Sequence, residues 1–357
     1  GLSMIMNHES LIATKARRVR TVAPKDALME FGLRRAQGHS AGLWGARAAM
    51  IGGFNGTSNV EAGKRFGIPV LGTMAHSWVM SFDEEIDAFR EYVRQYHDNL
   101  ILLADTYNVL EMGVPHAIQV FKELKEEGRL PGKYGIRIDS GDIAYLSQEA
   151  TRMFTEAGFP DAIISGSNDL DEYTIQSLKA QGCTVTSWGV GTKIITADGT
   201  SALGGVFKMA VKEADGKEVP VMKFSNDVEK MTNPGIKTVY RFYKKDTGKM
   251  ITDLVCLHDE KAADGGDFTL VTESAKWRRK ELKAGTYTVE ELLKPVVENG
   301  RNLPLPALSE IIRYADKQID TLWPEYTRLL NPDLMEINLS DKLQTLKSEL
   351  IRRELGE

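Results

Sequence analysis

The stretch that decides the fold is Ile68-Pro-Val-Leu-Gly-Thr-Met-Ala-His-Ser-Trp78. Its apolar start, Ile68 to Leu71, is typical of a short buried strand in a parallel sheet. The run ends at Gly72-Thr73, so His76 and Ser77 follow just beyond the carboxyl end of the strand. Ligands of α/β proteins bind at that edge of a parallel sheet. The stretch therefore predicts a strand end that carries functional side chains.

Four later strands are predicted to end in the same way, in polar or glycine-rich loops. These loops are Ala104–Thr106, Arg137–Asp142, Ser165–Asp169 and Trp188–Thr192. A lone histidine after a strand is more often a structural residue than a functional one. Five such strand ends at one edge of a sheet indicate one shared site, and this favours a functional role for His76.

The hydrophobic pattern predicts alternating strands and helices over the first part of the chain. Helices are expected at 7–20, from Pro24 to Arg35, at 41–51 and up to Phe66; strands at 68–71, 100–104, 134–138, 161–164 and 183–187; and further helices at 83–97, 115–127, 142–157 and 169–181. Strands separated by helices of this length form βαβ units with a parallel sheet. With every polar loop at one edge, a barrel fits better than an open sheet.

After Gly204 the pattern changes to short alternating segments at 206–212, 219–224, 238–243 and 250–257, which predict antiparallel hairpins. Helices are expected again at 288–297, 305–329 and 338–355. The fold class is thus α/β: a barrel-like parallel sheet with surrounding helices, a smaller antiparallel β region and C-terminal helices. The expected domains are 1–204, 205–287 and 288–357.

Composition excludes several classes of protein. The chain has 357 residues, 42% of them apolar and 27% charged, as in soluble proteins. Its net charge of −5 provides no basic field for nucleic acid. The longest apolar runs are far shorter than the roughly 20 residues that span a bilayer. Only Cys183 and Cys256 occur, which excludes a disulfide framework and fits a reducing cytoplasm.

Two of the loops have the character of a phosphate site. Gly189-Val-Gly191-Thr192 allows backbone N–H groups to approach a phosphate closely, and Ser165-Gly166-Ser167 follows the preceding strand. Arg137 and Asp139 leave their strand on the same side, because successive side chains alternate. Such a pair is either a simple ion pair or a clamp that holds an anion and a sugar diol.

Five ordered motifs together resemble the nicotinate phosphoribosyltransferase family. They are Phe31–Gln37 (FGLRRAQ), Gly53–Asn59 (GFNGTSN), Gly72–Ser77 (GTMAHS), Arg137–Asp142 (RIDSGD) and Gly189–Thr192 (GVGT). The resemblance covers nearly the whole chain. It implies an α/β-barrel domain, a homodimer and an ATP-dependent, ligase-type reaction that is the first step of NAD salvage. In that reaction nicotinate and phosphoribosyl pyrophosphate give nicotinate mononucleotide and pyrophosphate, coupled to ATP hydrolysis with Mg²⁺.

On the side of the base, the resemblance implies that Phe31 stacks on the pyridine ring and that Arg34 lies beside it. Arg137 would meet the nicotinate carboxylate or the 5′-phosphate. Ser58 stands where the nicotinamide phosphoribosyltransferases, by the same resemblance, carry an aspartate that receives the amide. A serine there favours a ligand with a carboxylate.

On the side of the ribose and phosphates, the resemblance implies that Asp139 binds the ribose hydroxyls. It also implies that the backbones of Gly166, Gly189 and Gly191 hold the phosphate, and Thr192 belongs to the same loop as Gly191.

His76 would be the residue that ATP phosphorylates, with Ser77 next to it and Asp105 as an orienting group or metal contact. No protein ligand of Mg²⁺ is assigned. The transfer itself needs no general base, because a pyridine nitrogen attacks C1 of the ribose with its own lone pair.

One departure from the family pattern concerns the N-terminal side. Members carry over a hundred residues before the segment that opens this chain, including a tyrosine-bearing stretch that reaches the partner's site, and nothing here matches them. The expectation is a fragment, or a protein whose other part is a separate polypeptide. Three alternatives stay open: nicotinamide phosphoribosyltransferase, quinolinate phosphoribosyltransferase, whose basic dicarboxylate pocket is not evident, and a non-catalytic protein that only binds phosphoribosyl ligands.

Overall fold

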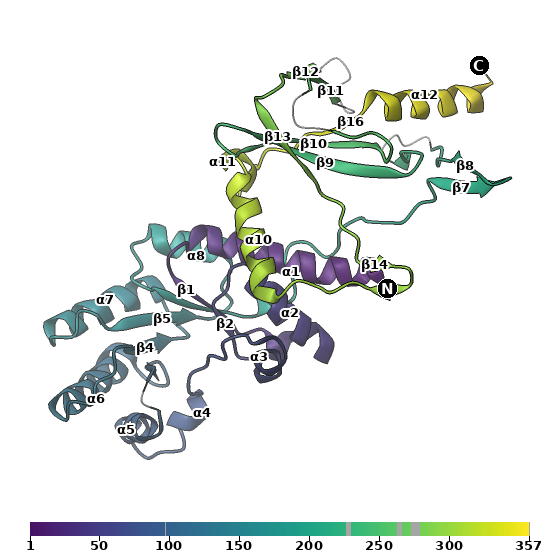
Figure 1. Cartoon of the computed structure of the whole chain (residues 1–357). Coiled ribbons are helices and arrows are strands. Elements are labelled where there is room, and N and C mark those ends of the chain that lie inside the picture. The colour runs from purple at the N-terminus through teal and green to yellow at the C-terminus, as the bar shows by residue number, and fades with distance from the viewer. Residues whose placement is uncertain (97, 226–229, 263–265, 273–278, 357) are drawn as a thin grey trace. The chain divides into compact units, whose positions relative to one another are not determined.

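The computed structural model describes residues 1–96, 98–225, 230–262, 266–272 and 279–356. The chain divides into two compact units, Gly1–Leu203 and Gly204–Glu357. Each unit has its own sheet (Figure 1). Each also has its own set of buried apolar side chains.

The first unit is built on six parallel strands in the order β2-β1-β6-β5-β4-β3. They are β1 (Ala27–Glu30), β2 (Gly56–Thr57), β3 (Leu100–Leu103), β4 (Tyr134–Ile138), β5 (Ile163–Ser167) and β6 (Ser187–Val190). Nearly all residues of these strands are buried, as expected for a parallel sheet covered by helices. The predicted barrel-like parallel sheet is confirmed as a half-barrel.

Helices alternate with these strands (Figure 1). They are α1 (Leu2–Val22), α2 (His39–Ile51), α3 (Val60–Phe66), α4 (His76–Val79), α5 (Glu85–Gln95), α6 (Val114–Glu126), α7 (Ile143–Glu156), α8 (Glu172–Ala180) and α9 (Thr192–Ile195), with single turns at η1 (Leu33–Arg35) and η2 (Val109–Gly113). Side-chain caps begin several of them: Asn59, Asp142 and Asp171 each accept a hydrogen bond from a backbone N–H of the first turn.

Two sequence predictions in this unit are wrong. The helix expected from Pro24 to Arg35 is instead strand β1 followed by the short turn η1. The strand expected at 68–71 is reduced to a single parallel bridge between Val70 and Thr57. The sequence Ala27-Leu-Met-Glu30 favours a helix by propensity, but pairing with β6 on one side and β2 on the other outweighs it.

The other predicted elements lie near their expected positions, with β5 and β6 shifted by two to four residues. The predicted helix 83–97 corresponds to α5, and its last residue, His97, lies outside the described residues. The shift of β5 matters for the site, because Ser165 and Ser167 belong to the strand and not to a loop after it.

The second unit holds an antiparallel-rich sheet in the order β12-β11-β16-β10-β9-β13. Its strands are β9 (Lys237–Lys244), β10 (Met250–Leu257), β11 (Phe268–Thr272), β12 (Arg279–Leu282), β13 (Tyr287–Glu291) and β16 (Ile337–Leu339). Two small hairpins, β7 (Val211–Ala214) with β8 (Lys217–Pro220) and β14 (Val297–Glu298) with β15 (Arg301–Asn302), and the helices α10 (Leu308–Thr321), α11 (Pro324–Thr327) and α12 (Asp341–Leu355) complete it.

The core of this sheet is a cluster of buried aromatic and aliphatic side chains that includes Phe242, Leu254 and Tyr287. Cys256 lies in the same cluster, and burial raises the pKa of its thiol to about 12. The helix predicted at 288–297 is wrong, because this segment contains β13 and β14. Its Glu and Leu residues favour a helix, but five residues from Tyr287 to Glu291 pair antiparallel with β9.

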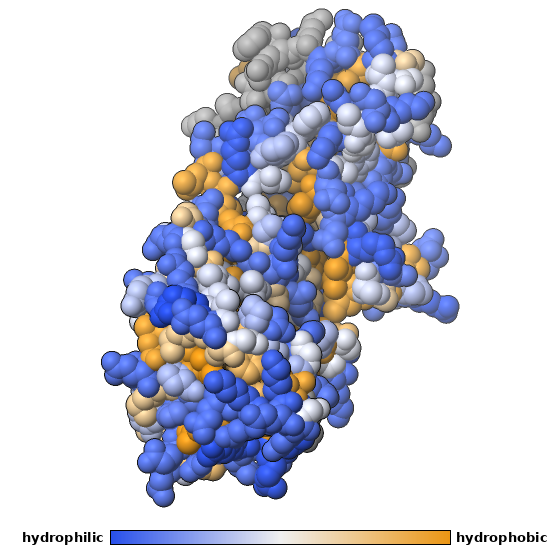
Figure 2. All heavy atoms as spheres, turned by 90° about the vertical axis from the view of Figure 1, so that its left-hand side faces the viewer, coloured by the Kyte–Doolittle hydropathy of each residue, from blue (hydrophilic) through white to orange (hydrophobic). Residues whose placement is uncertain are grey.

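Among the described residues, no helix combines the length and the apolar character needed to cross a bilayer. Hydrophilic side chains cover most of the face seen in Figure 2, and apolar side chains gather there only in small patches.

Candidate functional site

A cavity of about 700 Å³ lies in the first unit, where the strands end. Its walls come from the loops after β1, β2, β4, β5 and β6 and from the segment around Val70. The lining residues are Phe31, Leu33, Arg34, Arg35, Ser58, Gly72, Thr73, Arg137, Asp139, Ser167, Asn168, Asp169, Gly189, Gly191 and Thr192. The cavity has the size of a small-molecule site, and polar groups from five strand ends converge on it. Four of the five strand-end segments singled out in the sequence contribute lining residues, and the Ala104–Thr106 loop does not.

Arg137 organises the polar side of this cavity. Its Nε donates to Ser167 Oγ at 2.7 Å, Nη1 to Thr73 Oγ1 at 2.8 Å, and Nη2 to Asp139 Oδ1 at 2.8 Å. Ser167 Oγ also donates to Asp139 Oδ1. The guanidinium therefore fixes three side chains from three different segments and still has N–H groups to offer, since arginine carries five.

Asp139 is charged in this network. Burial acts against the carboxylate, but the hydrogen bond from Ser167 and the charge of Arg137 hold the pKa of Asp139 below its usual value. A carboxylate that is ionised and fixed in a cavity suits hydrogen bonds to hydroxyl groups and the stabilisation of a developing positive charge.

His76 and Asp105 lie next to this network, beyond the residues that line the cavity. His76 Nε2 is 3.8 Å from Asp139 Oδ2 and 4.0 Å from Asp105 Oδ1. Its other nitrogen, Nδ1, lies 3.1 Å from Thr106 Oγ1. The hydrogen bond that orients the ring thus involves Thr106, whereas the sequence had suggested Asp105. One ring nitrogen is held and the other faces two carboxylates.

Asp105 is almost fully buried and acts on the loop that follows β4. Its Oδ2 accepts from the Asp139 N–H at 3.0 Å and from Ser140 Oγ at 2.6 Å. Its Oδ1 has no hydrogen-bond partner among the described residues. The described residues hold no group of three or more His, Cys, Asp or Glu side chains arranged for a metal. A buried carboxylate oxygen without a hydrogen-bond partner fits Mg²⁺, which uses one or two carboxylates together with substrate phosphates.

Phe31 lies against the end of β6, where Gly189 belongs to the strand and Gly191 directly follows it. A Cβ placed on Gly189 would lie 2.6 Å from the Phe31 ring, and one on Gly191 would lie 2.9 Å from the Phe31 carbonyl oxygen. Both positions therefore require glycine for the close approach of Phe31, whatever else they bind. The ring is partly buried and lines the cavity, with the exposed Arg34 one turn further along the chain.

The structure brings most of the predicted residues together. Eight of them line the cavity: Phe31, Arg34, Ser58, Arg137, Asp139, Gly189, Gly191 and Thr192. Ser77 is exposed on α4 beside His76, and Gly166 lies inside β5, where a Cβ would press on Val185 and Trp188. Neither residue lines the cavity.

Seven of the fifteen lining residues were not predicted as site residues: Leu33, Arg35, Gly72, Thr73, Ser167, Asn168 and Asp169. Two of them and the buried Glu30 hold parts of the site in place. Ser167 and Thr73 both contact Arg137, and Glu30 lies buried beneath the loops of Phe31 and Ser58. Ser167 follows from two-residue alternation once β5 is placed correctly, since its side chain then shares a face with Ser165. Thr73 stands in the Gly72–Ser77 motif, but the sequence does not indicate the partner of Thr73 or of Glu30, because both partners are distant in the chain.

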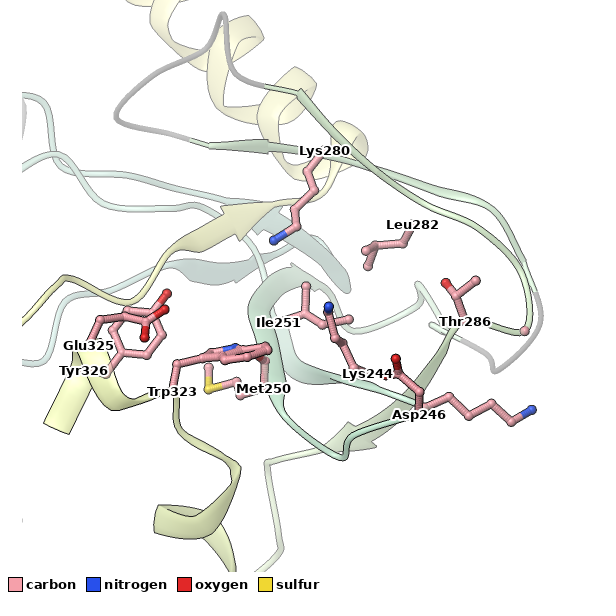
Figure 3. Close-up of a pocket in the computed structure, with 12 residues that line it drawn as sticks. Lys244, Asp246, Met250, Ile251, Lys280, Leu282, Thr286, Trp323, Glu325 and Tyr326 are labelled. Atoms are coloured by element: carbon pink, nitrogen blue, oxygen red, sulfur yellow. The ribbon is translucent and has the colours of Figure 1, made fainter.

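A second cavity, of about 690 Å³, lies in the second unit between the β9–β10 hairpin, β12 and the segment around α11 (Figure 3). Trp323, Met250 and Leu282 form apolar walls, and the ammonium groups of Lys244 and Lys280 point into the space between them. Among the described residues, neither ammonium group lies within ion-pairing distance of a carboxylate.

Comparison with known proteins gives consistent results. The model of the nicotinate phosphoribosyltransferase (NAPRTase) family matches residues 27–261, and that of the nicotinate phosphoribosyltransferase C-terminal domain matches residues 236–347. The nicotinate phosphoribosyltransferase of Bacillus subtilis is 42% identical over 355 residues, which are 98% of this chain and 71% of the relative. That of Caenorhabditis elegans is 33% identical over 95% of this chain and 69% of the relative.

Solved structures agree. The crystal structure of human nicotinic acid phosphoribosyltransferase matches with a TM-score of 0.82 and 30% identity, over 98% of this chain and 75% of that one. The nicotinate-nucleotide pyrophosphorylase of Pyrococcus furiosus matches with a TM-score of 0.67 at 23% identity, which supports the fold alone.

Proposed function

The chain belongs to the nicotinate phosphoribosyltransferase family, whose reaction transfers a phosphoribosyl group to nicotinate in NAD salvage, and from this premise we propose how its first cavity performs that reaction and couples it to ATP. The observation that carries the proposal is the network of Arg137, Asp139, Ser167 and Thr73 at the strand ends. It supplies fixed charges in a cavity that also holds an aromatic wall.

In the proposed reaction the lone pair of the pyridine nitrogen forms a bond to C1 of the ribose. The bond from C1 to the pyrophosphate oxygen breaks, and its electron pair leaves with pyrophosphate. No proton is removed, so no general base is needed. The protein must place the two reactants and stabilise a positive ribose centre and a negative leaving group.

The base enters on the side of Phe31 and Ser58. Phe31 stacks on the pyridine ring, and Arg34 and the hydroxyl of Ser58 receive the carboxylate. Stacking and a charge-assisted hydrogen bond suit an aromatic anion. Nicotinamide is the weaker ligand in this proposal, because its neutral amide forms no ion pair with Arg34 and position 58 carries no carboxylate to accept a hydrogen bond from the amide NH₂.

The ribose and its phosphates occupy the opposite side. Asp139, which is ionised, accepts hydrogen bonds from the ribose hydroxyls and stabilises the positive charge at C1. Arg137 holds Asp139 in place and adds its remaining N–H groups toward an anion. The backbones of Gly189 and Gly191, with Thr192, bind the 5′-phosphate.

ATP coupling is proposed to pass through His76. Thr106 holds Nδ1, so Nε2 takes the terminal phosphoryl group of ATP while ADP leaves. Water later takes the phosphoryl group from Nε2. Asp105, whose Oδ1 has no hydrogen-bond partner among the described residues, would hold Mg²⁺ together with Asp139. When bound, Mg²⁺ neutralises phosphate charge. Phosphorylation of His76 is a separate step, and the bond between the pyridine nitrogen and C1 of the ribose forms without it.

The direct test is formation of nicotinate mononucleotide and pyrophosphate from nicotinate and phosphoribosyl pyrophosphate, with and without ATP. Nicotinamide and quinolinate in place of nicotinate are the controls for the base. We expect product with nicotinate, stimulation by ATP, and little product with the other bases. Binding of phosphoribosyl pyrophosphate without any product would favour the non-catalytic alternative.

The phosphohistidine is tested with His76→Asn. This variant should lose the acid-labile phosphoryl-enzyme formed from labelled ATP and the nicotinate-stimulated hydrolysis of ATP, but keep a slow transfer that ATP does not stimulate. A variant that still takes up label and still couples ATP to transfer would return His76 to a structural role.

A further inference from the structure

Glu30 is a fully buried acid that the proposed reaction does not use. It is the last residue of β1, its exposed fraction is 0%, and both of its carboxylate oxygens have partners. Oε1 accepts the backbone N–H of Gly32, and Oε2 accepts the hydroxyl of Thr57 at 2.6 Å. The backbone oxygen of Glu30 accepts the N–H of Ser58 at 3.0 Å. One residue thus contacts two loops.

These two loops carry the groups that face the base. Gly32 directly follows Phe31, and Thr57 directly precedes Ser58; Phe31 and Ser58 both line the cavity. Thr57 Oγ1 also accepts the N–H of Asn59 at 3.0 Å, and Asn59 caps α3. The position of Ser58 is therefore fixed by Glu30 on one side and by the start of a helix on the other.

The fit around the carboxylate is close. A Cβ on Gly32 would lie 2.7 Å from Glu30 Oε1 and 2.5 Å from Ile195 Cβ. Both distances are too short for a side chain, so position 32 requires glycine. A side chain one methylene shorter than glutamate cannot reach both Gly32 and Thr57 without moving one of the loops. The two contacts therefore depend on the length of the side chain.

We propose that Glu30 is a positioning residue that sets the separation of Phe31 and Ser58 and through it the affinity for the pyridine base. The inference rests on the proposed function, because it assigns the base to this part of the cavity. Glu30 acts through its two hydrogen bonds and not through its charge. Burial also raises the pKa of Glu30, against the hydrogen bonds from Thr57 and Gly32, and so favours the neutral form that glutamine resembles.

The test compares Glu30→Asp with Glu30→Gln. Glutamine has the same length and can serve both partners, accepting from Gly32 and donating to Thr57. We expect the KM for nicotinate to rise about tenfold or more in Glu30→Asp, since displacements of about 1 Å have large effects, with the KM for phosphoribosyl pyrophosphate changed less than about twofold. Glu30→Gln should stay within about threefold of the parent for both substrates.

Glu172 provides a matched control, because it is equally buried but pairs with Lys15 and Arg18 of α1, away from the cavity lining. Glu172→Asp should lower the melting temperature without a selective rise in the KM for nicotinate. Equal changes in both KM values for Glu30→Asp, or a loss in Glu30→Gln as large as in Glu30→Asp, would overturn the proposal.

Thr57 provides a second route if Glu30→Asp does not fold. Thr57→Val removes the hydroxyl at nearly constant volume and should raise the KM for nicotinate, whereas Thr57→Ser should not; the reverse, or no difference, would overturn the proposal. Titration calorimetry with nicotinate separates the two claims. A parent protein that binds nicotinate but forms no mononucleotide contradicts the proposed function alone, and the affinities of the variants still decide the role of Glu30. A parent that does not bind nicotinate overturns both.

Discussion

The two cavities of this chain have nearly the same volume but different chemistry. In the first, Arg137 ties Thr73, Asp139 and Ser167 together with hydrogen bonds of 2.7–2.8 Å. In the second, Lys244 lies 5.4 Å from the centre of the Trp323 ring, and the lining mixes apolar side chains with separate charged ones such as Asp246 and Glu325. Charges held by several partners are already oriented for a transition state, whereas a lysine at the end of a flexible chain is not. The organisation of these charges, and not the volume of the cavity, is the reason for proposing the first cavity as the site.

The largest effect is expected from Arg137→Ala. The change leaves Asp139, Ser167 and Thr73 without their common donor, so we expect kcat/KM for mononucleotide formation to fall by about 100-fold or more. Arg137→Lys keeps the charge but cannot contact all three groups, and it should recover only part of the loss. Retention of activity within fivefold in Arg137→Ala would remove the basis of the comparison.

The second effect concerns the choice of base. An aspartate at position 58 repels the carboxylate of nicotinate and accepts a hydrogen bond from nicotinamide, a like-charge penalty of several kcal/mol when desolvated. Ser58→Asp should therefore reduce kcat/KM with nicotinate about 30-fold more than with nicotinamide. If both bases lose activity equally, Ser58 has only a structural role.

The third effect sharpens the role of the aromatic wall. Gly189→Ala would place a methyl group 2.6 Å from the Phe31 ring, so the ring must move, and the KM for nicotinate should rise about tenfold. The control is Gly132→Ala, because a Cβ on Gly132 meets nothing within 4 Å. Identical kinetics of the two variants would show that the position of Phe31 does not matter for the base.

A smaller effect concerns stability. Folding lowers the pKa of Asp139, so its contribution to the free energy of unfolding is present above the unfolded pKa of about 3.9 and is lost as pH falls through the lower folded value. Asp139→Asn should be less stable than the parent at pH 7, and urea unfolding should show the difference shrinking below about pH 4. A difference that is independent of pH would mean that the charge of Asp139 is not stabilised in the folded chain.

The smallest effect is expected in the second cavity. Lys280→Ala, alone or with Lys244→Ala, should leave kcat/KM within about twofold of the parent, because neither ammonium group has a role in the proposed reaction. Steady-state kinetics under the conditions used for Arg137→Ala measures this. A loss comparable with that of Arg137→Ala would mean that the comparison assigns the site to the wrong region.

The sequence predicted the elements whose apolar pattern is strong and local. Strands β4 and β10 were placed correctly, whereas β1 and all but the first residue of β13 were predicted as parts of helices. At Ala27–Glu30 the residues favour helix by propensity, and pairing with β6 outweighs it. At Tyr287–Glu291 the Tyr, Thr and Val residues favour strand, and pairing with β9 places them in the sheet, whereas the Glu and Leu residues that follow favour helix. Local pattern cannot show such pairing.

The same distinction applies to the site. Arg137, Asp139 and the Gly189 loop were found because polar or glycine residues follow apolar runs at strand ends. Thr73 and Glu30 were missed because their importance depends on which loops meet in space: Arg137 lies 64 residues from Thr73, and Glu30 lies 27 residues from Thr57. Contacts between residues so far apart in the sequence leave no local pattern by which they could be predicted from one sequence.

The most direct test of the central claim is a crystal structure of this chain with nicotinate mononucleotide. The account predicts density in the first cavity, with the pyridine ring against Phe31, the carboxylate toward Ser58, the ribose hydroxyls at Asp139 and the phosphate at Gly191 and Thr192. Density in the cavity beside Trp323 and Lys244, with the first cavity empty at saturating nucleotide, would contradict it.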